Sequence, residues 1–394
     1  MAPSSEGAPT DGEDQVGSAD RAEVNRELSK IREFAQSLRL DEVREGTWFS
    51  RLLRYSLDSY VREVDAGYLQ RKYPGLPPDA TVEARIQLAA RYASIEGGLS
   101  AGAYTGAVAA TIGSAGGASP LTLPAAGASF VVDLLFVSHL QLRLAYDIAV
   151  LYRVPLDLED PEDLWKLIRT AFAIKSGEAG REVVGKGAPI VLRPILKKLY
   201  GGSTLAAARS LPVIGRYLLK RNVLKFSIPA VGVPLSMAIN HWSTRTAGLQ
   251  ARKVFRAEAR IVEAARRMTD RTAHRTELLW VLWLVIKADG LIHENERALL
   301  KYVTEILRDV ESEMAALTEL EATVDLEHKR VWSLLAAAEG DLAPLYEAGV
   351  VAAAVDGKIN VNELTALRRL AEYCGTHVDE QAVRALAGGY AKGE

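Results

Sequence analysis

The chain has 394 residues and a net charge of −2, so it is long enough to bury a core in two or three domains. Its 48% hydrophobic and 25% charged residues are typical of a folded protein. The single cysteine, Cys374, excludes an internal disulfide framework and favours a reducing cytoplasm. One cysteine and six scattered histidines also exclude the ligand spacing of a zinc finger.

The N-terminal end is acidic. Residues 1–20 contain five acidic side chains, no basic one, and many Ser, Gly and Pro residues. Because such a composition buries little apolar surface, it predicts a disordered acidic tail. The absence of a basic and then apolar start predicts that no secretory signal is present.

Residues 21–96 have helical periodicity. Apolar side chains such as Leu28, Ile31 and Phe34 recur at steps of three or four residues. The sequence Tyr-Pro-Gly-Leu-Pro-Pro from residue 73 predicts a break, and a further amphipathic helix is expected to open at Val82.

Residues 97–132 contain no charged side chain over 36 positions. Gly98, Gly102 and Gly106 lie on one helix face, with a spacing that lets two helix backbones approach closely. The segment is long enough to span a bilayer, but its glycine and alanine are weakly hydrophobic and two prolines interrupt it. The composition favours a buried helical hairpin, while a spanning segment and shallow or conditional insertion stay open.

A long helix is predicted over residues 125–152, with an apolar stripe that includes Phe130 and Ile148. Pro155 is expected to follow its end. The sequence Asp-Pro-Glu-Asp from residue 160 then has the capping residue and the early proline of a helix start.

Residues 183–257 contain thirteen Lys or Arg and no Asp or Glu in 75 positions, and apolar runs lie between the basic residues. A one-sided basic and apolar stretch in a nearly neutral chain indicates an anionic partner, either membrane lipid or nucleic acid. The stretch has few aromatic residues for stacking on bases and no nucleic-acid-binding motif, so lipid is favoured. A solvated basic face without any partner is the alternative.

The candidate lipid-binding residues are the basic side chains of this stretch and one tryptophan that suits a membrane boundary. Each Lys or Arg near an anionic surface contributes about 1 kcal/mol, so five of the thirteen would contribute roughly 5 kcal/mol, enough for reversible attachment. A plain helix junction is the alternative role for the tryptophan. The candidates are Lys197, Lys198, Arg216, Lys220, Arg221, Lys225, Trp242 and Arg245.

A repeat marks the C-terminal domain. The pattern Asp-Gly-x-Ile-x-x-Asn-Glu begins at Asp289 and again 67 residues later at Asp356. Each copy follows an apolar helix and precedes an amphipathic one. We expect Gly290 and Gly357 to take the left-handed conformation that ends the first helix, and the glutamate to close a capping box at the start of the second.

The same repeat raises the question of a cation site. If its glycine is aligned with the sixth position of an EF-hand loop, the glutamate falls at the twelfth, but the first and third positions lack oxygen-bearing side chains in both copies. This excludes a calcium loop of that kind. An unconventional divalent-cation site stays the alternative to purely structural turns, with Asp289, Glu296, Asp356 and Glu363 as candidate ligands, and no other cofactor is indicated.

The repeat resembles the TerB family of tellurite-resistance-type helical domains over roughly residues 270–390. This resemblance implies an acidic, metal-binding surface that includes the four residues above, and a link to stress and tellurite resistance at the bacterial inner membrane. The second copy departs from the family pattern only in having Val355 where alanine is usual.

The middle of the chain, over about residues 80–260, resembles EcsC-family proteins. The resemblance is carried by the Gly/Ala segment 97–118, by Leu123-Pro124 with the helix after it, and by residues 227–240. It implies membrane-proximal work and no particular reaction.

Catalytic patterns are weak in this sequence. Gly98-Leu-Ser-Ala-Gly102 fits the Gly-x-Ser-x-Gly pattern, but a nucleophile elbow needs a preceding strand and the residues before it have helical periodicity. His139 lies in an apolar helix, as a core or interface histidine would. The phosphate-loop, dinucleotide, metalloprotease and kinase motifs are all absent. We therefore predict no catalytic residues, and an enzyme of an unrecognised class stays an alternative.

The sequence thus predicts an all-α protein with a tail, an EcsC-like helical domain over residues 21–268 and a smaller TerB-like helical bundle over residues 269–394. We expect a cytoplasmic, non-enzymatic protein of bacterial type, peripheral to the inner membrane. It would dock on anionic lipid through the central domain, while the C-terminal domain recruits a protein partner or senses a cation in stress response or defence. The alternative is an effector- or toxin-like protein that inserts residues 97–132 and perturbs a membrane.

Overall fold

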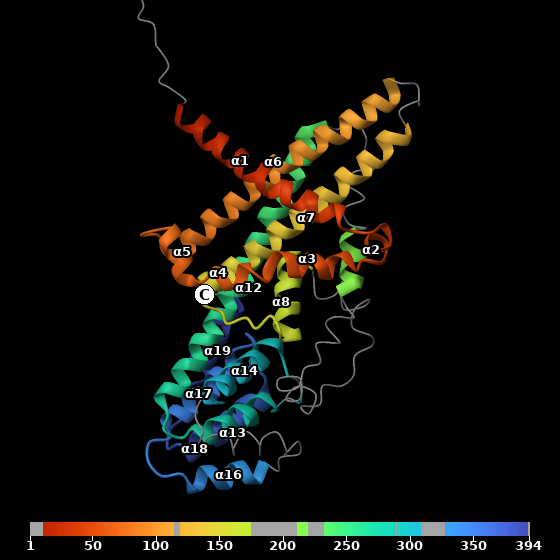
Figure 1. The fold of residues 1–394 in the computed structure, drawn as a ribbon. Coiled ribbons are helices and arrows are strands. Elements are labelled where there is room, and N and C mark those ends of the chain that lie inside the picture. Colours follow the sequence, from red (N-terminus) through yellow and green to blue (C-terminus); the bar gives the residue numbers. More distant parts are fainter. Residues whose placement is uncertain are drawn as a thin grey trace, which may run out of the picture. The chain divides into compact units, whose positions relative to one another are not determined.

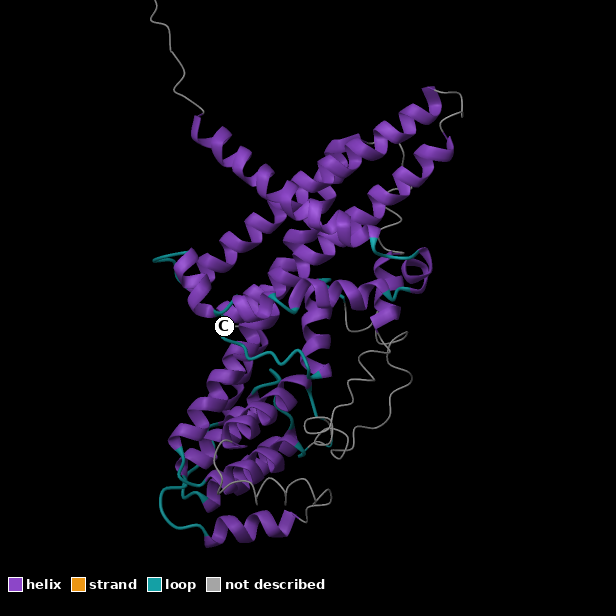
Figure 2. Cartoon of the chain, in the orientation of Figure 1, coloured by secondary structure: helices purple, strands orange, loops and turns teal. Residues whose placement is uncertain are grey.

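The computed structural model describes residues 11–113, 119–174, 211–219, 232–288, 290, 292–308 and 328–392. Within these ranges every regular element is a helix, so the protein is all-α as predicted (Figure 2). The chain divides into two compact units. Unit 1 contains residues 1–151, 155–185 and 204–252, and unit 2 contains residues 152–154, 186–203 and 253–394.

Unit 1 is arranged around helix α7, which packs most extensively on α6 and also packs on α1, α3, α5 and α8 (Figure 1). Residues 211–219 are also helical. The labelled helices of the unit are α1 (Asp11–Gln36), α2 (Leu40–Glu45), α3 (Trp48–Leu57), α4 (Tyr60–Glu63), α5 (Ala66–Lys72), α6 (Pro78–Gly113), α7 (Ser119–Leu151), α8 (Pro161–Ala171) and the first part of α12 (Gly232–Arg271).

Several helix boundaries follow from local sequence as predicted. Helix α5 ends before the Tyr-Pro-Gly break, where Gly75 has a positive φ of 76°. Asp160 caps α8 by accepting a hydrogen bond from the Glu162 N–H, with proline in the first turn. Helix α7 begins at Ser119, earlier than expected. Pro120 is compatible with this start because it lies in the first turn, where a backbone N–H has no partner within the helix and its absence in proline removes no hydrogen bond.

Residues 97–113 form the end of α6 and residues 119–132 form the start of α7, so the two helices of the predicted hairpin are present (Figure 1). The burial of the hairpin stays a prediction, because the side chains of residues 104–127 lie outside the described residues. Asp147 of α7 is completely buried and accepts hydrogen bonds from Arg85 Nε of α6 at 2.9 Å and from the Tyr60 hydroxyl of α4 at 2.7 Å. Because removing one partner of a buried ion pair leaves an uncompensated charge, this contact fixes the register of the hairpin.

In the part of the chain that the structure describes, Ala128–Leu151 of α7 is the one stretch long and apolar enough to cross a membrane, with a mean hydropathy of 1.4. Within this stretch 78% of the apolar window is buried inside the protein. A core helix of a folded protein has the same length and composition, and the contacts of α7 with its neighbours are those of a core helix.

Residues 11–20 correct the prediction of a disordered tail over residues 1–20, since they form the start of α1. The carboxylate of Asp20 forms an ion pair with Arg91 Nη1 at 2.7 Å, and Val24 and Leu28 further along are buried. The acidic composition of these residues therefore did not prevent helix formation. Residues 1–10 lie outside the described residues.

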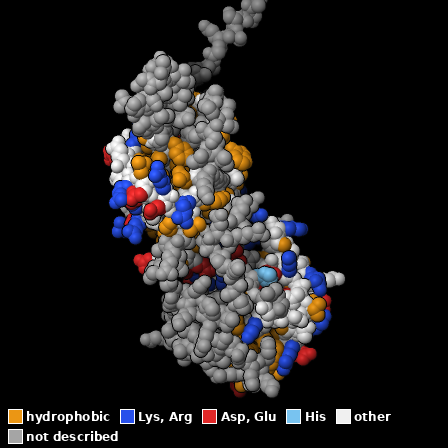
Figure 3. All heavy atoms as spheres, turned by 90° about the vertical axis from the view of Figure 1, so that its right-hand side faces the viewer, with side chains coloured by type: hydrophobic (Ala, Val, Ile, Leu, Met, Phe, Trp, Pro, Cys, Tyr) orange, Lys and Arg blue, Asp and Glu red, His pale blue; other side chains and the backbone are white. Residues whose placement is uncertain are grey.

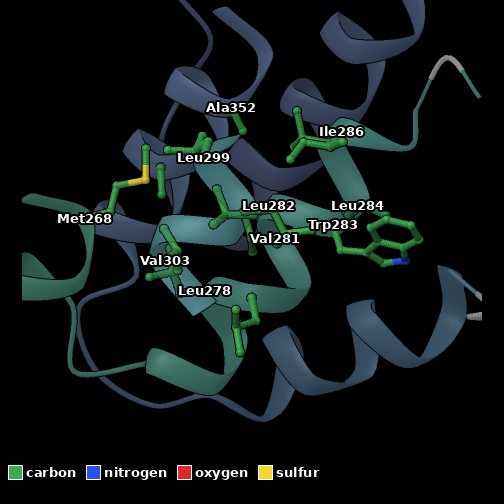
Figure 4. Close-up of a cluster of buried hydrophobic side chains, with 14 of the residues drawn as sticks. Met268, Leu278, Val281, Leu282, Trp283, Leu284, Ile286, Leu299, Val303 and Ala352 are labelled. Atoms are coloured by element: carbon green, nitrogen blue, oxygen red, sulfur yellow. The ribbon is translucent and has the colours of Figure 1, made fainter. Parts of the chain in front are cut away.

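Unit 2 is a smaller bundle around α13 (Arg275–Ile286), which is buried on all sides from Leu278 to Ile286. Figure 4 shows side chains of this helix, among them Val281 and Leu282, beside Leu299 and Val303. A helix that is apolar all round must be covered by others. Those covering it are α14 (Glu294–Arg308), α16 (His328–Ala337), α17 (Ala343–Ala354) and α18 (Val361–Tyr373), while α19 (Glu380–Lys392) packs on α17.

Helix α12 contributes to both units, because the division falls between Arg252 and Lys253. The sequence predicted the boundary at residue 268, near the end of the same helix. The difference arises because the C-terminal part of α12, including Ile261, Ala265 and Met268, belongs to the core of unit 2.

Candidate functional site

The two repeat turns in unit 2 have the predicted backbone geometry. Gly290 and Gly357 have φ values of 77° and 87°, the left-handed conformation that ends a helix. In the second copy Asn360 and Glu363 form a complete capping box, in which the Glu363 N–H donates to Asn360 Oδ1 at 2.9 Å and the Asn360 N–H to Glu363 Oε2 at 2.8 Å. The repeat therefore builds two helix-turn-helix units.

The first copy uses its glutamate in the same way, since the His293 N–H donates to Glu296 Oε2 at 2.6 Å. The two copies also contact each other. Asn295 Nδ2 donates to the Val355 carbonyl at 2.9 Å, and His293 Nε2 lies 3.6 Å from Asp356 Oδ2. The sequence did not predict that the two copies contact each other, because neither segment by itself indicates a contact with a segment 67 residues away.

The four candidate cation ligands are only partly brought together. Glu296 and Glu363 are buried and cap their helices, Asp356 is partly exposed and faces His293, and Asp289 lies outside the described residues. Among the residues that the structure describes, no group of three or more His, Cys, Asp or Glu side chains is arranged to hold a metal ion. A cation site at this repeat stays a prediction.

Two candidate lipid-binding residues lie on an exposed face of α12. Trp242 is 68% exposed, and Arg245 follows one turn later and is also exposed. Leu249, a further turn along, is 39% exposed. We call these three residues the α12 face. A tryptophan this exposed leaves most of its ring in contact with water.

Other basic residues of the acid-free stretch are engaged within unit 1. Arg252 pairs with Glu83 of α6 at 3.2 Å, and Arg216 Nη1 donates to the Glu45 carbonyl at 3.3 Å. On the face drawn in Figure 3, Lys and Arg side chains lie beside Asp and Glu side chains and exposed hydrophobic ones. The remaining candidates, Lys197, Lys198, Lys220, Arg221 and Lys225, lie outside the described residues.

Of the three glycines predicted to allow close helix packing, Gly98 lies against another helix and Gly102 does not. A Cβ added at Gly98 would lie 3.1 Å from Met237 Sδ of α12, and one added at the preceding Gly97 would lie closer to α12, at 2.8 Å from Asn240 Nδ2 and 2.9 Å from the Ser236 carbonyl. At Gly102 an added Cβ would meet no atom within 4 Å. Gly106 lies in α6, but its surroundings are outside the described residues.

A buried polar cluster that the sequence analysis missed lies at the base of the α6–α7 hairpin. Asn240 Nδ2 donates to Asp133 Oδ1 at 2.7 Å and to Glu96 Oε2 at 3.3 Å, and the Ser100 hydroxyl donates to Glu96 Oε1. All four side chains are buried, and Asp133 Oδ2 has no hydrogen-bond partner among the described residues. We call these four residues the hairpin-base cluster. It joins both ends of the charge-free segment to α12.

The serine of the Gly-x-Ser-x-Gly pattern is Ser100 of this cluster. It lies inside helix α6, where it bonds the carboxylate one turn before it. A nucleophile elbow requires a strand-to-helix turn that exposes the serine, and Ser100 is only 4% exposed. The packing role that the sequence favoured is confirmed, and Ser100 is excluded as an elbow nucleophile.

His139 is buried, as expected for a core histidine. Its Nδ1 lies 2.9 Å from Ser56 Oγ, and Glu27 Oε2 lies 3.7 Å from its Nε2. Burial lowers the pKa of His139 to about 4, and the adjacent imidazole is the main cause that lowers the pKa of Glu27 to about 2. Because Ser56 is completely buried, no substrate reaches this Ser, His and Glu arrangement.

Comparison of the chain with family models, with curated proteins and with solved structures finds no match.

Proposed function

We propose that the protein attaches reversibly to anionic membrane surfaces through unit 1, and that unit 2 is its module for a partner or a cation. The observation that carries this proposal is the α12 face, where an exposed tryptophan lies one turn from an exposed arginine. An aromatic ring gains free energy at the headgroup level of a membrane, and a neighbouring arginine is attracted to anionic lipid. The resemblance to EcsC-family proteins supports the same interpretation.

The α12 face would supply much of the attachment energy. Burying the ring of Trp242 contributes about 2 kcal/mol at about 25 cal/mol per Å² of apolar surface. Arg245 adds about 1 kcal/mol near an anionic surface. Each further unpaired basic residue of the acid-free stretch that reaches the surface would add a similar amount.

Peripheral attachment is favoured over spanning by α7. The candidate spanning stretch contains Asp133, Arg143 and Asp147, and Asp147 is held by a buried ion pair with Arg85. A charged residue at the centre of a bilayer costs about 3 kcal/mol, and breaking the buried pair adds to that cost.

Vesicle flotation of the full chain tests the proposal. We expect binding to vesicles that contain phosphatidylglycerol, weak binding to phosphatidylcholine alone, and loss of binding at high salt. Trp242→Ala should weaken binding about thirtyfold and Arg245→Gln about fivefold, from the contributions above. Leu40→Ala and Arg62→Gln, at exposed positions on α2 and α4, are matched controls that should bind as the unmodified chain does. Binding that ignores both lipid charge and salt would refute the electrostatic part.

Insertion of the α6–α7 hairpin is the second candidate function. One observation favours it: the segment between Glu96 and Asp133 is free of charge, and both carboxylates lie at the base of the hairpin. Leakage of a dye from phosphatidylglycerol vesicles on adding the protein would support insertion, whereas flotation without leakage supports attachment alone.

For unit 2, the resemblance to TerB domains supports a cation- or partner-binding role. Thermal unfolding with and without added Ca²⁺, Mg²⁺ or Zn²⁺ tests the cation part, because an ion that binds only the folded state raises the melting temperature. A rise that Asp356→Asn removes would support a site at the repeat. No rise with any of the three ions would refute it.

A further inference from the structure

The turn that joins α5 to α6 in unit 1 presents a run of exposed apolar residues (Figure 1). Each residue of the sequence Pro-Gly-Leu-Pro-Pro at positions 74–78 is exposed, and Leu76 at its centre is 48% exposed. Single exposed apolar side chains are ordinary on protein surfaces, whereas a consecutive run of them indicates a contact surface. The turn is therefore a candidate contact that neither the α12 face nor the repeat includes.

The backbone of this turn is held in one conformation. Gly75 has a φ of 76°, the positive value that the third position of a type II turn requires, and Pro74 occupies the second. The Leu76 N–H donates to the Tyr73 carbonyl at 3.4 Å, and the Tyr73 N–H donates to the Leu69 carbonyl of α5 at 3.0 Å. Because the turn is ordered before it meets a partner, binding through Leu76 loses little conformational entropy.

The same run is poor in backbone donors. Pro74, Pro77 and Pro78 have no N–H, and the Leu76 N–H is bonded within the turn, so only the Gly75 N–H would need a new partner on leaving water. A backbone polar group without a partner is costly in apolar surroundings, and this cost keeps most loops out of the hydrocarbon region of a membrane. A proline-rich turn lowers that cost.

Two basic side chains precede the run. Arg71 and Lys72 form the last turn of α5, both are exposed, and within the described residues neither forms an ion pair. Lys72 Nζ lies 5.9 Å from the ring centroid of Tyr68, which is itself 37% exposed. The neighbouring carboxylates have local roles, since Asp65 accepts the Tyr68 N–H at 2.6 Å and Asp79 lies in the first turn of α6, where the helix dipole favours it. The tip thus combines an apolar run with two available cations.

We propose that the α5–α6 turn inserts shallowly into an anionic bilayer, with Leu76 and the flanking prolines below the headgroups and Arg71 and Lys72 at headgroup level. A soluble anion would engage the cations and leave the apolar run in water, whereas a bilayer interface accepts both. This inference rests on the proposed membrane attachment of unit 1 and adds to it a second contact, separate from the α12 face.

A fluorescent label at the tip tests the insertion. In the full chain with Cys374→Ser, which removes the only natural thiol, Leu76→Cys carries a polarity-sensitive dye, and Leu40→Cys, at a 78% exposed position of α2, carries it as the control. On vesicles of phosphatidylglycerol and phosphatidylcholine we expect the dye at position 76 to shift to the blue and to be quenched by a lipid-borne quencher. The dye at position 40 should show neither change.

The outcomes separate this proposal from the one on which it rests. If the labelled protein floats with the vesicles while the dye at position 76 stays in water, insertion of the turn is overturned and attachment of unit 1 stands. The exposed turn would then fit a protein partner. If the protein does not float with the vesicles, both proposals are refuted.

Variants measure the two contributions. Leu76→Ser should weaken vesicle binding about fivefold. Arg71→Gln with Lys72→Gln should weaken it at least tenfold on phosphatidylglycerol vesicles and less at high salt, because each basic residue near an anionic surface contributes about fivefold. Arg32→Gln with Arg44→Gln removes the same charge at exposed positions of α1 and α2 and is the matched control. Equal weakening by both pairs would overturn the role of the two cations at the turn.

Discussion

Lowering the pH should destabilise unit 1 through His139, whose side chain is surrounded on every side by the core. Ser56 of α3 contacts its Nδ1, and Glu27 of α1 faces its Nε2. The cations of Lys30 and Arg143 oppose protonation together with burial, and Glu27 favours it. Tyr55 of α3 packs its ring against the imidazole at a centroid distance of 5.7 Å. The folded protein therefore favours the neutral imidazole of His139, because protonation would place a positive charge in the core.

The size of the effect follows from the lowered pKa. In unfolded chains the His139 pKa returns to its ordinary value of 6.5, whereas in the folded protein it is about 4. Between these values the unfolded chain binds a proton that the folded chain does not, so the free energy of unfolding falls as the pH falls. The loss amounts to about 3 kcal/mol and levels off below pH 4. Glu27 adds a loss at lower pH, because its pKa is lowered from 4.5 to about 2.

Urea unfolding at pH values from about 7 to about 4, with hydrogen exchange of peptides from α3 and α7 as the readout, measures this loss within unit 1. His139→Asn should flatten the pH dependence over this range, because its amide oxygen can still accept from Ser56 but does not titrate. His241→Asn, at an exposed position of α12, should leave it unchanged. If the His139→Asn variant loses stability with falling pH as steeply as the unmodified chain, the reasoning is refuted.

Two further predictions concern buried polar contacts. Asn240→Leu should destabilise unit 1 by about 3 kcal/mol, because it leaves the carboxylates of the hairpin-base cluster without their shared donor, and adding Asp133→Asn should recover part of this loss. Hydrogen exchange of α6 and α7 peptides in urea measures the stability of both variants. Equal stability of the single and the double variant would contradict the shared-donor role. Glu363→Ala should destabilise unit 2 by about 1 kcal/mol through loss of its hydrogen bond to the Asn360 N–H, as thermal unfolding would show, whereas Glu372→Ala at an exposed position of α18 should have no effect.

The repeat shows which structural features can be predicted from local sequence. The left-handed glycines and the capping box at Asn360 and Glu363 were predictable, because each depends on residues within a few positions of one another. The contact between His293 and Asp356 was not, since it depends on how two helix-turn-helix units pack. Whether the repeat holds a cation is likewise a question of packing.

The hairpin-base cluster illustrates the same limit in unit 1. Glu96 and Asp133 are recognisable in the sequence only as the two ends of a charge-free segment, and Asn240 lies more than a hundred residues further along. Nothing in their spacing indicates that one amide joins both carboxylates, because a hairpin and a third helix must first bring them together. The close approach at Gly97 in place of Gly102 has the same origin, since the crossing point of α12 decides which glycine is needed.

Periodicity, caps and turn residues were enough to determine that this chain is all-α, where several helices begin and end, and that its last part contains a doubled turn, because these features are encoded over one or two helical turns. The tertiary structure alone decided which charges are buried in pairs, and that the one tryptophan of α12 faces water. Those outcomes depend on contacts between helices distant in sequence, and the free energy of burying or exposing a side chain is set only once those helices have packed.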